Sequence, residues 1–67
     1  MAIARVTEIT AGSTKSFDDA INKGIKRANK KLRKVEGAWI QDQKLVVKNG
    51  KVSEYRVNMK ISFVMDE

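Results

Sequence analysis

Cysteine and histidine are both absent from the 67 residues of this chain. Without cysteine the chain forms no disulfide framework and offers no thiolate to a metal ion. Without histidine it lacks the commonest metal ligand and general base near neutral pH. The serines therefore have no imidazole to activate them, and nothing indicates a buried lysine that would take its place. We predict that the protein is not an enzyme.

Long apolar runs are absent as well. No stretch approaches the roughly eighteen apolar residues that cross a bilayer. The N-terminal MAIARVTEI also lacks the basic start and apolar core of a secretory signal. These features predict a cytoplasmic protein with no membrane partner.

The chain is short and basic. A single domain spanning residues 1–67 buries only about 60% of the surface that its unfolded chain exposes, so oligomerisation is the remaining way to supplement a thin core. The formal net charge is +6 and the pI is near 9.9. This charge raises the expectation of anionic partners, such as nucleic acid, phosphates or nucleotides, without choosing among them.

The first half of the chain has the pattern of a strand followed by a helix. β-Branched residues predict a strand over residues 2–9, and small residues predict a loop over residues 10–15. Ser16 has the character of a helix N-cap, with Asp19 three residues on. Apolar residues then recur at three- and four-residue spacing, which predicts a helix of about five turns. They are Phe17, Ala20, Ile21, Gly24, Ile25, Ala28, Leu32 and Val35.

The second half has the pattern of a β-hairpin. Residues 37–47 predict a strand, with Trp39, Gln41, Gln43, Leu45 and Val47 on one face. Asn49-Gly50 predicts a type I′ turn. Residues 52–66 alternate clearly between an apolar face and a polar face, and at about 3.3 Å per residue this strand is near 50 Å long. The single predicted helix is too short to cover that length.

These elements predict an α+β fold of the β-α-β-β type. Antiparallel pairing of the last two strands, with one helical crossover after the first, gives a three-stranded sheet of order 1-3-2 with the helix on one face. Both sheet edges are then exposed. Natural proteins pair or bury such edges, so we predict self-assembly into a homo-oligomer.

The order and spacing of several short motifs resemble the dodecin family over nearly the whole chain. These motifs are the Glu8-Ile9 strand end, the Gly12-Ser13-Thr14 loop, the Ser16-Phe17 helix start and the string GKVSEYRVNMKISF. The resemblance implies a β-α-β-β subunit of a hollow homododecamer with cubic symmetry. Helices would lie outside, and sheets would line an interior that holds flavins.

Two positions depart from the flavin-binding members of that family. The resemblance places the flavin-stacking tryptophan at Gly37 and the flavin-bonding glutamine at Arg56. Glycine has no aromatic face, and arginine donates hydrogen bonds but never accepts them. We therefore expect flavin, as riboflavin or its phosphate, to bind weakly or not at all. The resemblance implies a small-ligand binding or storage assembly, whose ligand would be a flavin, another nucleotide-like aromatic or a coenzyme-like phosphate.

Four further residues are candidate ligand contacts beside Gly37. Trp39 is either a relocated stacking platform or a subunit contact, where aromatics are common. Arg56 either binds a phosphate or carboxylate or joins a solvated charge ladder. Gln43 and Lys44 occupy positions where the resemblance places ligand contacts, although polar residues there also simply face water.

Charged residues suggest two other partners. Seven cations crowd the second half of the predicted helix and would form a surface for nucleic acid, although cations also favour a helix C-terminus without any ligand. They are Lys23, Lys26, Arg27, Lys30, Lys31, Arg33 and Lys34. Nucleic acid is therefore the alternative partner and not the favoured one. Acidic residues from neighbouring subunits would similarly hold cations at symmetry axes, or would act as ordinary surface acids. A cation-stabilised structural shell without an organic ligand is therefore a further alternative. They are Asp42, Glu54, Asp66 and Glu67.

Overall fold

Four elements follow one another in the computed structural model, which describes residues 3–32 and 34–65. They are strand β1 (Ile3–Ser13), helix α1 (Phe17–Leu32), strand β2 (Val35–Lys48) and strand β3 (Lys51–Met65). The predicted β-α-β-β order is confirmed. Within the described ranges, no helix is long and apolar enough to cross a membrane.

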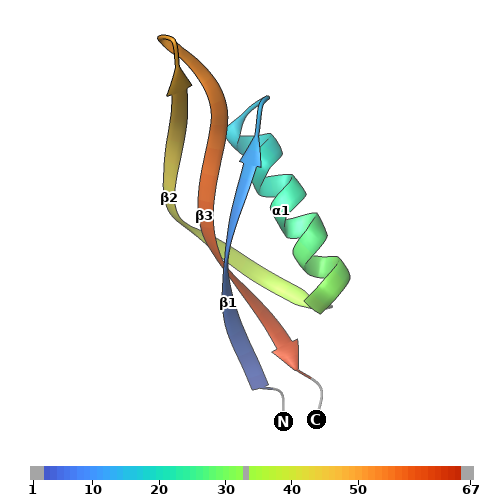
Figure 1. The fold of residues 1–67 in the computed structure, drawn as a ribbon. Coiled ribbons are helices and arrows are strands. Elements are labelled where there is room, and N and C mark those ends of the chain that lie inside the picture. The colour runs from blue at the N-terminus through green and yellow to red at the C-terminus, as the bar shows by residue number, and fades with distance from the viewer. Residues whose placement is uncertain (1–2, 33, 66–67) are drawn as a thin grey trace.

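The three strands form one antiparallel sheet of order β1-β3-β2. Strand β3 pairs along nearly its whole length with both neighbours, from Ile3↔Met65 to Ser13↔Tyr55 on one side and from Val35↔Phe63 to Lys48↔Lys51 on the other. Figure 1 shows the strongly twisted sheet with α1 along one face. The longest dimension of the molecule is 52 Å, which agrees with the length predicted for β3.

The core lies between α1 and the central strand. Val57, Met59 and Ile61 of β3 are fully buried, and they meet Ala20 and Ala28 of the helix. Partly buried side chains surround this centre, namely Ile9, Ala11, Phe17, Ile21, Ile25, Leu32 and Val35. The alternation of β3 therefore turns Tyr55, Val57, Met59 and Ile61 towards the helix, as predicted.

Gly24 sets the distance between the helix and the sheet. A Cβ atom at this position would lie 2.7 Å from Met59 Cε and 2.9 Å from Ala11 Cβ. The Met59 methyl group is the end of a flexible side chain, but Ala11 Cβ is attached directly to the backbone of β1. Only glycine therefore allows the helix to approach this closely.

Hydrogen bonds tie the start of α1 to the end of β1. The Asp19 amide donates to Ser16 Oγ at 3.0 Å, which confirms Ser16 as the N-cap. The Asp19 carboxylate accepts from Ser13 Oγ at 2.6 Å and pairs with Lys23 at 3.1 Å. The hydroxyl of Ser13, which is buried, also accepts from the Lys15 amide at 2.9 Å. This network positions the helix relative to the sheet.

Two predicted boundaries are wrong, and both were decided by tertiary contacts. Residues 10–13, predicted as part of a loop, belong to β1 because β3 continues far enough to pair with them up to Ser13↔Tyr55. Val35, predicted as the last apolar helical residue, instead begins β2. The chain turns at Lys34, which has a φ of 40°, so α1 ends at Leu32 while Val35 still packs against the core. The hairpin turn is as predicted, with φ of 53° at Asn49 and 73° at Gly50.

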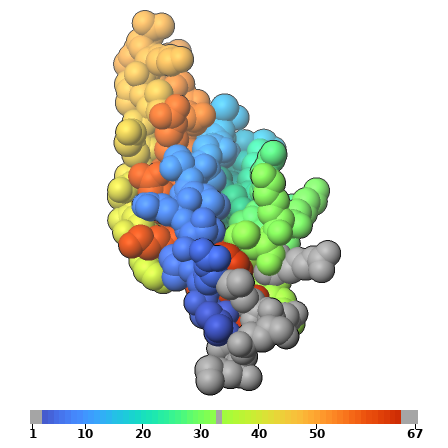
Figure 2. Space-filling model, turned by 60° about the horizontal axis from the view of Figure 1, so that its bottom comes forward, coloured from blue at the N-terminus to red at the C-terminus, as the bar shows by residue number. Residues whose placement is uncertain are grey.

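Strand β2 and the hairpin end extend beyond the cover of the helix. Figure 2 shows the β2–β3 hairpin as a projection from the body formed by β1 and α1. Besides Trp39, four large apolar side chains of β2 and of the adjoining start of β3 remain exposed, two on each face of the sheet, and we call them the uncovered β2 strip. They are Ile40, Leu45, Val47 and Val52, with 38%, 46%, 58% and 46% of their surface accessible.

Candidate functional site

The sheet face that turns away from α1 is the candidate site, and we call it the open face. Residues directly opposite one another in antiparallel strands share a face, so the register assigns its members from the burial of Val57, Met59 and Ile61 on the other face. From β1 they are Ala4, Val6, Glu8, Thr10 and Gly12; from β2, Gly37, Trp39, Asp42, Lys44, Val46 and Val47; and from β3, Val52, Glu54, Arg56, Asn58, Lys60, Ser62 and Val64. The open face is mostly polar.

A bulge at Gln41 changes which residues of β2 lie on this face. The register shifts between Ile40 and Asp42, and an extra residue in one strand inverts the alternation beyond it. Trp39 consequently lies opposite Lys60 on the open face, whereas Gln43 lies opposite Val57 on the helix side. The prediction that Trp39 and Gln43 share a face is therefore wrong.

Trp39 and Lys60 form an aromatic and cationic pair in the open face. The Lys60 ammonium lies 5.8 Å from the centroid of the indole ring, within the range of a cation–π contact. Glu8 of β1 lies on the other side of Lys60 in the same row. Trp39 has 49% of its surface exposed, so an indole face or edge is available to a ligand or to another subunit.

The next polar row is joined by hydrogen bonds across all three strands. Thr10 Oγ1 donates to Asn58 Oδ1 at 2.6 Å, and Asn58 Nδ2 donates to Asp42 Oδ1 at 2.7 Å. Asp42 follows the bulge directly, so the inverted alternation is what brings its carboxylate to Asn58. These hydrogen bonds hold the side chains of Thr10, Asn58 and Asp42 in place beside Trp39.

A second charged group surrounds Arg56. Arg56 Nε donates to Glu54 Oε1, and the Glu54 carboxylate lies against Gly12, where a Cβ atom would be 3.1 Å from Glu54 Cδ. Lys44 lies opposite Arg56 across the β2–β3 pair. Arg56 keeps 48% of its side chain exposed, so it can still meet an anion while its charge is partly balanced by Glu54.

The five predicted ligand contacts do not form one cluster within a subunit. Gly37, Trp39, Lys44 and Arg56 lie on the open face, but Gln43 does not. Lys60, the partner of Trp39, lies four positions along β3 from Arg56, which corresponds to about 13 Å. Gly37, whose carbonyl accepts from Ser62 Oγ at 3.3 Å, is farther still from Arg56.

Sequence reasoning missed the residues that organise the open face. Thr10 was assigned to a loop, and nothing in the sequence linked it to Asn58 and Asp42. The pairing of Trp39 with Lys60 was also missed, since it depends on the strand register. The alternation predicted for β3 correctly places Asn58 and Lys60 on the polar face of that strand, but it does not show which β2 residues lie beside them.

The described residues contain no group of three or more acidic side chains that would hold a metal ion. Asp42 accepts a hydrogen bond from Asn58, and Glu54 pairs with Arg56. Asp66 and Glu67, the other two acids considered for cation sites between subunits, lie outside the described residues.

The fold and the open face define a small α+β subunit with a polar, partly aromatic sheet surface opposite its only described helix. The sequence model of the dodecin family matches residues 3–66. The chain belongs to the dodecin family. No match was found among curated proteins.

Solved structures of dodecins superimpose closely on this chain. Dodecin from Streptomyces davaonensis is 30% identical, covers 98% of this chain and 97% of its own, and has a TM-score of 0.94. Dodecin from Streptomyces coelicolor is 27% identical, with coverage of 98% and 94% and a TM-score of 0.94. A calcium dodecin from Mycobacterium tuberculosis, described as calcium chelating, is 26% identical, with coverage of 96% and 91% and a TM-score of 0.84.

Proposed function

We propose that this protein is a non-enzymatic small-ligand binding or storage assembly, built as a homododecamer from dodecin-type subunits. The observation that carries the proposal is the membership of the dodecin family over residues 3–66, together with an open face that exposes Trp39 beside Lys60. Binding pockets commonly combine an apolar or aromatic surface with a few placed polar groups.

Uncovered surface supports the assembly. The uncovered β2 strip exposes four apolar side chains, and both outer strands have a free edge because only β3 is paired on two sides. A second copy would bury this strip and cover an edge, so association supplies the apolar burial that one subunit lacks.

The ligand site of the assembly lies on the open face and is completed between subunits. Trp39 with Lys60 and Arg56 with Lys44 are about 13 Å apart within one chain, so a ring system stacked on Trp39 does not by itself extend to the Arg56 group of the same subunit. A ligand between copies can take its stacking contact from one subunit and its charged contact from another. The positions that bind flavin in the family hold Gly37 and Arg56 here, and flavin itself is therefore a weak ligand.

Native mass spectrometry of the freshly purified protein tests this proposal. We expect a twelve-subunit species that releases a small organic molecule when it is dissociated, and light scattering should give the same mass in solution. A monomer of about 7.6 kDa at micromolar concentration would overturn both the assembly and the site between subunits. A dodecamer that carries no small molecule and binds none would overturn the ligand-binding part alone.

A further inference from the structure

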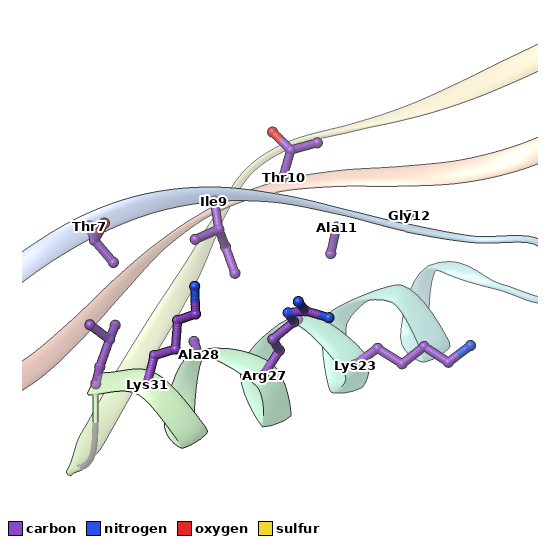
Figure 3. Close-up of a pocket in the computed structure, with 11 residues that line it drawn as sticks. Thr7, Ile9, Thr10, Ala11, Gly12, Lys23, Arg27, Ala28 and Lys31 are labelled. Atoms are coloured by element: carbon purple, nitrogen blue, oxygen red, sulfur yellow. The ribbon is translucent and has the colours of Figure 1, made fainter.

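A groove runs between the outer edge of β1 and the flank of α1, and we call it the β1–α1 groove. It has a volume of about 470 Å³ and lies on the helix side of the sheet, and of the open-face residues it shares only Thr10 and Gly12 of β1. Figure 3 shows Ile9 and Ala11 pointing from β1 towards the helix, while Thr10 points to the other side of the sheet. Gly24, Ala28 and Leu32 complete an apolar floor.

The strand that borders this groove has an unpaired edge. In the described sheet β1 pairs only with β3, so the backbone groups on its outer side have no strand partner. Proteins bind extended peptides at such edges, because an added strand satisfies these backbone groups. Thr7 and Gly12 mark the two ends of the exposed segment that lines the groove.

Three cations form the rim of the groove. Lys23, Arg27 and Lys31 are exposed and line it at four-residue spacing, and their side chains extend from the same flank of the helix (Figure 3). Lys23 already pairs with Asp19. Arg27 and Lys31 have no ion-pair partner among the residues that the structure describes, so the rim carries uncompensated positive charge.

The spacing of these cations matches that of side chains on an extended strand. Residues four apart in an α-helix are separated by about 6 Å along its axis. Residues two apart on a strand are separated by about 6.6 Å and lie on the same face. A peptide added to β1 can therefore place acidic side chains at alternate positions close to successive cations.

Pairing of this β1 edge with the β1 edge of a second copy fits the groove less well. If two β1 edges paired about a twofold axis, both helices would lie on the same side of the joined sheet. The Lys23, Arg27 and Lys31 rows of the two copies would then approach each other. Like charges that face each other oppose association, so the charge of the rim favours an acidic partner over self-pairing.

We infer that the β1–α1 groove is a docking site for an acidic peptide segment in extended conformation. The segment adds as a strand to the edge of β1, and its alternate acidic side chains meet Lys23, Arg27 and Lys31. The methylene groups of the acidic side chains cover the apolar floor of the groove. This inference is independent of the ligand proposed for the open face.

Fluorescence anisotropy with a labelled peptide tests the inference on the assembled protein. The probe is a peptide of about seven residues with alternating glutamate and valine, long enough to span residues 7–12 at about 3.3 Å per residue. One control peptide has the same composition with all glutamates at one end. A second has methylated amides at alternate positions, so it keeps its charge and loses its strand hydrogen bonds. We expect both controls to bind about tenfold more weakly or worse.

Matched protein variants separate the groove from the general charge of the helix. Arg27→Glu reverses a rim charge, and Lys26→Glu makes the same change at an exposed neighbour that does not line the groove. We expect Arg27→Glu to weaken the alternating peptide about tenfold and Lys26→Glu to have a much smaller effect. Arg27→Gln, a milder change, should give an intermediate result with the fold and mass unchanged.

Three outcomes would overturn the inference. The first is no binding of the alternating peptide, as expected if another subunit covers the groove. The second is equal binding of the methylated or charge-block peptide. The third is an equal loss in Lys26→Glu and Arg27→Glu together with equal competition by an oligonucleotide, which would make the helix a general polyanion surface.

Discussion

Lys60 holds its ammonium 5.8 Å from the centre of the Trp39 indole, and the two residues are partners across β2 and β3. Gly37 lies one row farther along the same face, opposite Ser62. An aromatic side chain is thus present in the open face, but one row away from Gly37, where the sequence resemblance predicts the flavin-stacking position. The Lys60 ammonium beside the indole adds a positive charge to this part of the open face.

Flavin should bind this protein weakly, and two substitutions should restore binding. If one stacking contact and one hydrogen bond contribute about 1 kcal/mol each, the Gly37→Trp and Arg56→Gln double variant should bind riboflavin about thirtyfold more tightly. At the backbone, a Cβ at Gly37 would meet only the Ser62 hydroxyl, at 3.1 Å, so the Ser62 side chain must move slightly to admit it. Quenching of flavin fluorescence gives the affinity.

The control for this titration is Trp39→Ala in the unmodified protein. Submicromolar flavin affinity without the two substitutions would contradict the prediction. Loss of that affinity in Trp39→Ala would then show that the stacking surface had moved to Trp39.

Leu45→Glu should break the assembly. Leu45 is 46% exposed in the subunit and belongs to the uncovered β2 strip, so we expect it to be buried between copies, where an unpaired carboxylate is strongly unfavourable. Light scattering should show loss of the twelve-subunit mass. Asn29→Glu, which adds the same charge at an exposed helical position, should leave the mass unchanged. Intact dodecamers of Leu45→Glu would mean that the strip is not an interface.

Gly24→Ala should destabilise the protein although alanine is the better helix former by about 1 kcal/mol. The added methyl group would meet Ala11 Cβ at 2.9 Å, and β1 must move to admit it. Overpacking of this kind costs about 1–3 kcal/mol. Denaturant unfolding at a fixed protein concentration measures the change, since association contributes to stability.

The matched control is Gly37→Ala, where the nearest atom is a hydroxyl that can rotate. We expect little change in unfolding free energy there. Equal or greater stability of Gly24→Ala would show that the helix and sheet separate without cost.

Asp19 should make the stability pH-dependent in the acid range. The hydrogen bond from Ser13 and then the contact with Lys23 lower the pKa of the Asp19 carboxyl below its ordinary value. A group whose folded pKa is depressed stabilises the fold above its unfolded pKa, near about 4, and loses that contribution as the pH falls through the folded pKa. The stability difference between the unmodified protein and Asp19→Asn should thus be full at neutral pH and shrink below pH of roughly 4.

Thermal unfolding of both proteins across this range measures the effect. Asp18→Asn is the control, since Asp18 occupies the same first turn of α1 and is exposed. A difference that stayed constant down to the lowest pH would show that the charge of Asp19 is not responsible.

Local sequence determined the elements whose signals involve neighbouring residues. The alternation of β3 identified its buried face, Ser16 with Asp19 marked the start of α1, and Asn49-Gly50 set the hairpin turn. Each signal depends on a backbone periodicity or a turn conformation that a few adjacent residues specify. The order of the strands then followed from simple rules of connection.

Tertiary structure alone decided the rest. The end of β1 at Ser13 depends on how far β3 continues beside it, and the position of Val35 depends on the turn at Lys34. The bulge at Gln41, which separates Gln43 from Trp39, is a property of two paired strands. A local pattern shows which residues alternate, but only pairing shows where the alternation is interrupted, because a bulge is stabilised by contacts that the partner strand provides.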